Sequence, residues 1–183
     1  MTLTLRKTVS HGRIGEAVVT AKCWMYGIPA HNTNGLRANF AGSDIIVDTA
    51  DPRRKLLVQV KSGYTRAGQV YFTQASGPDD LETPKFKADF VVFVNIDEKA
   101  GPAHAHDGTL DFQHFRFFVV PVEDANRLFR EAVRREHERP KRDGGIRSLA
   151  GLAVYAAPST MEIYHNAWHL LRSAAHISEV PCP

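Results

Sequence analysis

Cysteine is scarce in this chain of 183 residues, which contains only Cys23 and Cys182. Two cysteines so placed form neither a disulfide framework nor a zinc knuckle, so we expect a reducing compartment. The first ten residues lack the apolar segment of a signal peptide, and the longest charge-free run, residues 148–161, is too short to span a bilayer. We therefore expect a cytoplasmic protein with no membrane contact.

Several common catalytic motifs are also absent. The glycines at 144, 145 and 151 belong to neither a GxGxxG nor a GK[ST] pattern, and no serine nucleophile elbow occurs. With 43% hydrophobic and 23% charged residues, the composition is that of a folded protein. The length fits one domain, residues 1–183, and a net charge of +3 permits a polyanionic partner without requiring one.

The hydrophobic pattern predicts a mixed α/β protein. Apolar residues recur at helical spacing over 12–26, between a capping Ser10 and a terminating Gly27. Short β-branched and aromatic runs between turn residues predict strands. The expected strands are 28–33, 43–48, 56–61, 69–73, 88–96 and 115–121, and the later helices are a brief one at 79–87, then 123–139 and 160–177.

The strands 43–48 and 56–61 read as a β-hairpin joined by residues 51–54. Alternation gives it one apolar face and one polar face. With a four-residue loop, Ala50 lies opposite Lys55, and Asp44 then lies opposite Lys61. Ile46 lies opposite Gln59, so that an acid, an amide and an ammonium meet at one end of the hairpin.

This polar group is suitable for phosphodiester hydrolysis with a divalent metal. Asp44, the Gln59 amide oxygen and the Val60 backbone carbonyl are oxygen ligands of the kind that such ions prefer. Lys61 would orient or deprotonate the attacking water, or stabilise the developing charge. Glu16 would reach the same metal from the opening helix, directly or through water. Taken alone, the hairpin residues also fit a merely solvated strand face.

The order of these residues resembles the PD-(D/E)XK, or restriction-endonuclease-like, nuclease superfamily. Glu16 stands in an opening helix, Asp44 on a strand, and Gln59-Val60-Lys61 on the paired strand. The chain is similar to uncharacterised bacterial members with a QxK motif. Ser43 replaces the motif's proline, and Gln59 replaces its second acid, which predicts weaker metal affinity than an all-carboxylate site has.

The resemblance implies an α/β fold with an α-β-β-β-α-β core, a mixed central sheet flanked by helices, and additional C-terminal helices. The core would cover residues 10–122 and the helical extension residues 123–183. It further implies a Mg²⁺- or Mn²⁺-dependent endonuclease acting on DNA, for which a homodimer is one arrangement. The alternatives are a catalytically inactive nuclease-like module that binds nucleic acid or protein, and an unrelated α/β scaffold.

Basic residues outside the hairpin's polar face are candidates for contacts with the phosphate backbone. Arg53 and Arg54 lie in the hairpin loop, and Arg127, Arg130 and Arg134 lie on the helix expected over 123–139. The alternative for the helix is a solvated surface on which charges four residues apart pair with one another.

Overall fold

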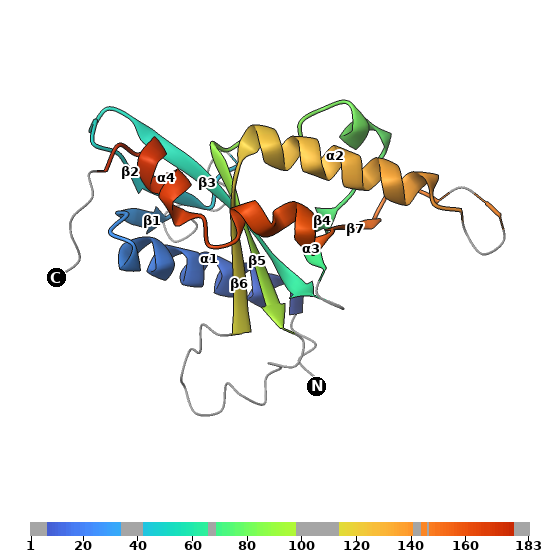
Figure 1. Ribbon diagram of the computed structural model, residues 1–183, viewed down its shortest axis with the longest axis horizontal. Coiled ribbons are helices and arrows are strands. Elements are labelled where there is room, and N and C mark those ends of the chain that lie inside the picture. The colour runs from blue at the N-terminus through green and yellow to red at the C-terminus, as the bar shows by residue number, and fades with distance from the viewer. Residues whose placement is uncertain are drawn as a thin grey trace.

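A mixed β-sheet with helices packed on both of its faces forms the centre of the protein (Figure 1). The computed structural model describes residues 7–33, 42–65, 69–97, 114–140, 144–145 and 147–177. The elements in chain order are α1 (Lys7–Met25), β1 (Ala30–Asn32), β2 (Ile45–Asp48), β3 (Lys55–Thr65), β4 (Val70–Gln74), η1 (Pro78–Leu81), β5 (Phe90–Asp97), β6 (Phe115–Pro121), α2 (Val122–Glu138), β7 (Ala153–Ala156), α3 (Pro158–Met161), η5 (Glu162–Tyr164) and α4 (Trp168–Ala174).

The main sheet has the strand order β1-β2-β3-β5-β6. Strands β3 and β5 are parallel, and every other neighbouring pair in this sheet is antiparallel. Strands β4 and β7 form a separate antiparallel pair. The predicted fold class, a mixed central sheet flanked by helices, is therefore confirmed.

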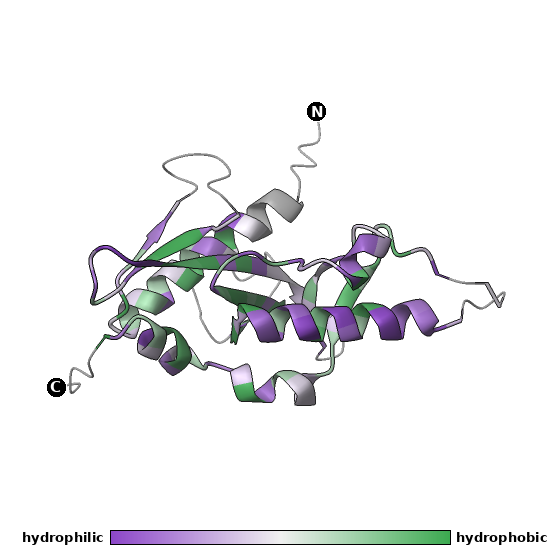
Figure 2. Ribbon diagram, turned by 90° about the horizontal axis from the view of Figure 1, so that it is seen from above, coloured by the Kyte–Doolittle hydropathy of each residue, from purple (hydrophilic) through white to green (hydrophobic). Residues whose placement is uncertain are grey.

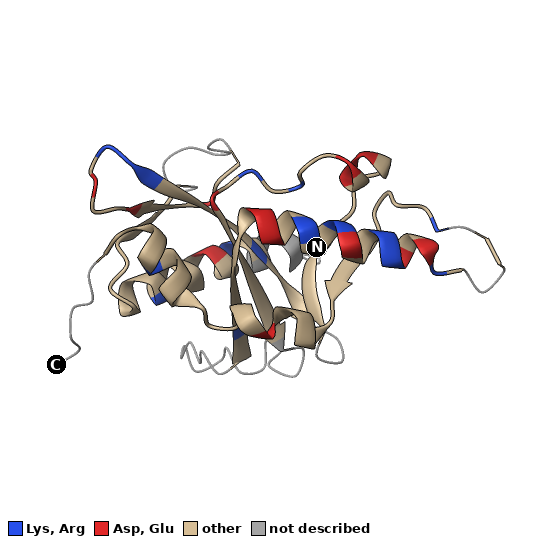
Figure 3. Ribbon diagram, turned by 45° about the horizontal axis from the view of Figure 1, so that its top comes forward, with Lys and Arg blue, Asp and Glu red and all other residues tan. Residues whose placement is uncertain are grey.

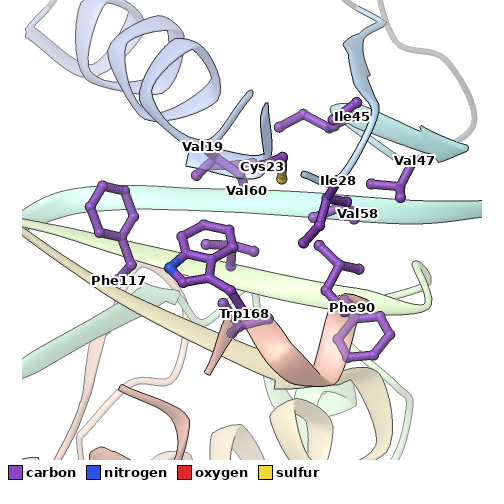
Figure 4. Close-up of a cluster of buried hydrophobic side chains, with 14 of the residues drawn as sticks. Val19, Cys23, Ile28, Ile45, Val47, Val58, Val60, Phe90, Phe117 and Trp168 are labelled. Carbon is purple, nitrogen blue, oxygen red and sulfur yellow. The ribbon is translucent and has the colours of Figure 1, made fainter. Parts of the chain in front are cut away.

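Each face of the main sheet has its own hydrophobic cluster. On one face, α1 and α4 pack against alternate residues of β3, β5 and β6, and Figure 4 shows this cluster, with Trp168 beside Phe117 at a ring distance of 5.6 Å. On the other face, α2, β4 and β7 cover the intervening residues, including Val91 and Phe93. Helix α2 turns mainly hydrophilic residues outward (Figure 2). None of the helices within the described ranges combines the length and the apolar character that a membrane crossing needs.

The opening helix begins earlier than expected. It starts at Lys7, so Ser10 lies inside its first turns and does not cap it. Its C-terminal end agrees with the prediction, because Gly27 follows with φ +67°, the left-handed conformation that glycine adopts without a Cβ penalty. The Ile28 amide then donates to Cys23 O at 2.8 Å and closes the end of the helix.

The expected helix over 79–87 is wrong in extent, since only the 3-10 turn η1 forms there. The amide and hydroxyl of Thr83 both donate to Asp79 O, at 2.8 Å each, and Pro84 follows, which cannot continue a helix. The Asp80 carboxylate accepts from the Ser76 amide and pairs with Lys85 at 3.2 Å, which fixes this segment without a longer helix.

A single helix over 160–177 is also wrong. The segment divides into α3, η5 and α4 because His165 forms a bridge to Phe118 on β6. The next residue, Asn166, has φ +52° and donates its amide to Phe117 O at 2.9 Å. Tertiary pairing with the sheet edge thus interrupts a helical sequence pattern.

Strand β7 was not expected at all, because its residues are mainly small.

Candidate functional site

The hairpin of β2 and β3 forms as predicted, but in a different register. Ile46 faces Leu57 and Asp48 faces Lys55, whereas a four-residue loop had placed Gln59 opposite Ile46. The loop is longer because the Thr49 hydroxyl donates to Arg54 O at 2.9 Å and keeps both residues out of the ladder. Asp48 and Lys55 form an ion pair of 2.8 Å across the first rung. The pairing of Asp44 with Lys61 is therefore wrong by two residues.

The correct register still brings Asp44 to the predicted part of β3. Its amide donates to Val58 O at 2.9 Å, and its carboxylate Oδ2 accepts from the Val60 amide at 2.7 Å. Asp44 therefore contacts the backbone on both sides of Gln59. Carboxylate oxygens are among the ligands that hard divalent cations prefer.

Gln59 and Lys61 share the face of β3 opposite the α1–α4 cluster, because they alternate with the buried Val58 and Val60. The Gln59 side-chain oxygen Oε1 is buried and has no hydrogen-bond partner within the described parts of the chain. A buried carbonyl oxygen without a donor is destabilising. A bound cation would supply the interaction that this oxygen lacks.

The Val60 carbonyl has a suitable direction for the same purpose. In an extended strand, the N–H and C=O of one residue point to the same edge. The Val60 amide points at Asp44, so its carbonyl oxygen faces the β2 side as well. Strand β2 begins at Ile45, near this point, whereas β3 continues past it to Thr65.

Lys61 is half-buried, and desolvation lowers the pKa of its ammonium group below the ordinary value. The negative charges of Asp44 and Glu16 raise that pKa, and the positive charge of Lys85 lowers it. Burial outweighs the two carboxylates. Lys61 thus lies within electrostatic range of both predicted acids, as the proposed chemistry requires.

Glu16 is positioned by the close approach of α1 to β3. A Cβ at Gly15 would lie 2.7 Å from Ser62 Cβ and 3.3 Å from Val60 Cγ1, so only glycine permits this packing. The Glu16 carboxylate accepts from Asn32 Nδ2 at 3.2 Å. The residue after Asn32, Thr33, donates its amide to Asp44 O at 3.0 Å. Strand β1 therefore connects Glu16 with Asp44.

Neither Asn32 nor Lys85 was expected at this site, although the sequence marks Lys85 as a basic residue that could extend the contacts with nucleic acid. Asn32 holds Glu16, and Lys85 contributes a second positive charge that acts on Lys61. Asn32 lies in a weak three-residue strand, and Lys85 lies in the segment mistaken for a helix. Only the short distance in sequence between the strand expected over 28–33 and Asp44 could have indicated that Asn32 lies near the site.

The donor set fits a divalent cation only if neutral oxygens take part. In the described ranges, no group of three or more His, Cys, Asp or Glu side chains is placed to hold a metal ion. Asp44 and Glu16 supply the carboxylates, and Gln59 and Val60 supply neutral carbonyls. Oxygen ligands of both kinds occur at magnesium and manganese sites.

The candidate contacts for nucleic acid lie at two places (Figure 3). Arg53 and Arg54 are exposed at the hairpin loop. On α2, Arg127 pairs with Asp124 at 2.9 Å and with Glu131 at 3.3 Å, which agrees with a solvated, ion-paired surface at that position. Arg130 donates to Asn126 O at 3.3 Å, and Arg134 is exposed.

No family model and no curated protein matches this chain. Among solved structures, it is similar to a bacterial homing endonuclease, I-Ssp6803I, with 16% sequence identity and a TM-score of 0.50. The match covers 96% of this chain and 100% of that one. At this identity the similarity establishes the fold, which is nuclease-like.

Proposed function

We propose that this chain is a Mg²⁺- or Mn²⁺-dependent endonuclease that hydrolyses phosphodiester bonds in DNA. It would belong to the PD-(D/E)XK superfamily with glutamine in place of the second acid. The observation that carries the proposal is the buried Gln59 Oε1 without a hydrogen-bond partner in the described residues, bracketed by the contacts of Asp44. The nuclease-like fold supports it.

Asp44, Gln59 Oε1 and the Val60 carbonyl would hold the metal, with Glu16 as a further ligand, directly or through water. When bound, a divalent ion supplies Lewis-acid neutralisation of charge at the phosphate. The lowered pKa of Lys61 increases the share of neutral amine that can accept a proton from water. In its protonated form, the same group stabilises negative charge that develops on the phosphate.

The test is cleavage of supercoiled plasmid DNA in Mn²⁺. We expect nicked or linear product from the parent protein, and a rate lower by a factor of about 100 or more in Asp44→Asn and in Lys61→Met. Asp48→Asn is the matched control, because Asp48 lies on the same hairpin but pairs with Lys55 and His31. Equal cleavage by the parent and both site variants would contradict the mechanism.

A catalytically inactive nuclease-like module is the second candidate. The neutral Gln59, and the lack of a group of three acidic, His or Cys ligands in the described ranges, favour it. Calorimetric titration with Mn²⁺ separates the two functions. The enzyme should bind the ion in a manner lost in Asp44→Asn and kept in Asp48→Asn, whereas the inactive module should show no such difference.

A further inference from the structure

A polar cavity lies between the C-terminal half of α2 and the β4–β7 pair, a part of the fold visible in Figure 1. Its volume is about 440 Å³. Three arginines line it, together with one glutamate and two neutral hydrogen-bonding side chains: Arg135, Arg139, Arg147, Glu136, Gln69 and Tyr155. Positive charge thus predominates in a concave site that the hairpin chemistry does not use.

The arginines come from two separate segments that are tied together. Arg135 lies on α2 and donates through Nη2 to Tyr155 O on β7 at 2.8 Å. His137, also on α2, donates from Nδ1 to Arg147 O at 3.1 Å and so fixes the later segment against the helix. Because a guanidinium has five N–H donors, the bond of Arg135 to Tyr155 O leaves it donors that can bind an anion as well.

The position of these charges at a helix C-terminus offers a simpler explanation. Basic residues there interact favourably with the helix dipole, which accounts for Arg135 and Arg139. Glu136 lies 4.0 Å from Arg139 and neutralises part of the charge. Neither effect accounts for Arg147, which lies outside the helix and whose Nε is buried without a hydrogen-bond partner in the described residues. A buried charged donor of this kind requires an acceptor.

We propose that this cavity binds a phosphate group. Guanidinium groups match the oxygen geometry of phosphate through paired N–H···O bonds, and three of them exceed the charge of the single glutamate. Two sources supply this chemistry: the backbone of a nucleic acid, or a free phosphorylated small molecule. The site is independent of the hairpin residues, so it does not require cleavage activity.

The first test is calorimetric titration of the full chain with inorganic phosphate in EDTA. Arg147→Lys keeps the charge but removes Nε, and Arg139→Ala removes a side chain that is 66% exposed, so its fold should be unaffected. We expect each to weaken binding by about ten-fold or more. Arg13→Ala, an exposed arginine on α1, is the matched control and should bind as the parent does.

The second test uses a DNA duplex without terminal phosphates, also in EDTA. If the backbone is the source, both pocket variants bind the duplex more weakly, and the slope of log affinity against log salt falls by about one. Loss of inorganic phosphate binding alone assigns the pocket to a free phosphorylated molecule. Both results support the phosphate site. Unchanged behaviour of both variants in both titrations overturns it.

Discussion

Gln59 is the residue on which the proposed metal site depends most. Its buried oxygen lacks a hydrogen-bond partner in the described part of the chain, an arrangement that costs about 1–3 kcal/mol. Such a cost is common at functional sites, where a ligand supplies the missing interaction. A glutamine that only solvated the strand would place this oxygen in water.

Replacing Gln59 by glutamate should strengthen metal binding. The new carboxylate adds several kcal/mol of gross Coulomb attraction to a divalent ion at an effective dielectric constant of about 20. We expect the Kd for Mn²⁺ to fall by about ten-fold or more in Gln59→Glu, measured by calorimetry, and to rise in Gln59→Leu. The same Kd in the parent and both variants would exclude Gln59 as a ligand.

Lys61 should make stability depend on pH. Because burial lowers its pKa, the folded chain holds this proton less tightly than the unfolded chain does. The free energy of unfolding therefore rises with pH between the lowered pKa and the ordinary value of 10.5, through this group alone.

The comparison with Lys61→Met isolates this effect. At neutral pH, we expect the free energy of unfolding of the variant to exceed that of the parent by about 0.5–2 kcal/mol, the range that single stabilising changes bring. The difference should narrow as the pH approaches 10.5. Urea unfolding across this range measures it, and a difference that stays constant with pH would contradict the buried charge.

At the scale of elements, the contact of α1 with β3 positions Glu16. We expect Gly15→Ala to push the helix from the strand, with a loss of about 1–3 kcal/mol of stability. Ser62→Gly removes the two atoms that a Cβ at Gly15 would meet most closely. The double variant should therefore recover part of the loss.

A thermodynamic cycle over the two single variants and the double variant tests this contact. The expected coupling is favourable by about 0.5 kcal/mol or more. The same cycle on plasmid cleavage should show the same sign, because the position of Glu16 depends on this packing. Additive effects on stability would mean that α1 does not approach β3 at Gly15.

The strands of the hairpin could be predicted because apolar and polar residues alternate along both of them. Their register could not, because it depends on the hydroxyl of Thr49, which bonds across the loop and lengthens it. The prediction of the site residues does not depend on this register, because the Asp44 carboxylate accepts a hydrogen bond from the Val60 amide. The break in the helix expected over 160–177 could not be predicted either, because the bridge of His165 to Phe118 is a tertiary contact that no local sequence pattern contains.

At the scale of the whole molecule, the C-terminal elements contribute to both hydrophobic clusters. Trp168 and Leu171 of α4 belong to the cluster under α1, and Val154 of β7 and Met161 of α3 belong to the cluster under α2. We propose on this basis that residues 1–183 form one domain. The segment after 122 would then be part of the core and not an appendage.

Truncation tests this proposal. A chain ending at Pro140 loses the large buried side chains of both clusters, each of which contributes several kcal/mol. We expect it to lack a cooperative thermal transition, whereas the full chain should unfold in one transition with equal calorimetric and van't Hoff enthalpies. A truncated chain that melts cooperatively near the temperature of the full chain would refute the single domain.

The fold class could be predicted from the sequence because long periodic segments determine it. The cavity proposed to bind phosphate could not be predicted. Its arginines stand at 135, 139 and 147, and only the packing of β7 against α2 forms a cavity from them. Strand β7 itself carries little sequence signal. Sites built from one hairpin are therefore easier to predict than sites built from distant segments.

The most direct measurement is the anomalous scattering of Mn²⁺ in crystals of the parent protein soaked with the ion. We expect a peak coordinated by an Asp44 carboxylate oxygen, Gln59 Oε1 and the Val60 carbonyl oxygen, with Lys61 Nζ beside it. A peak elsewhere, or a Gln59 oxygen turned toward a protein donor with no ion at Asp44, would contradict it.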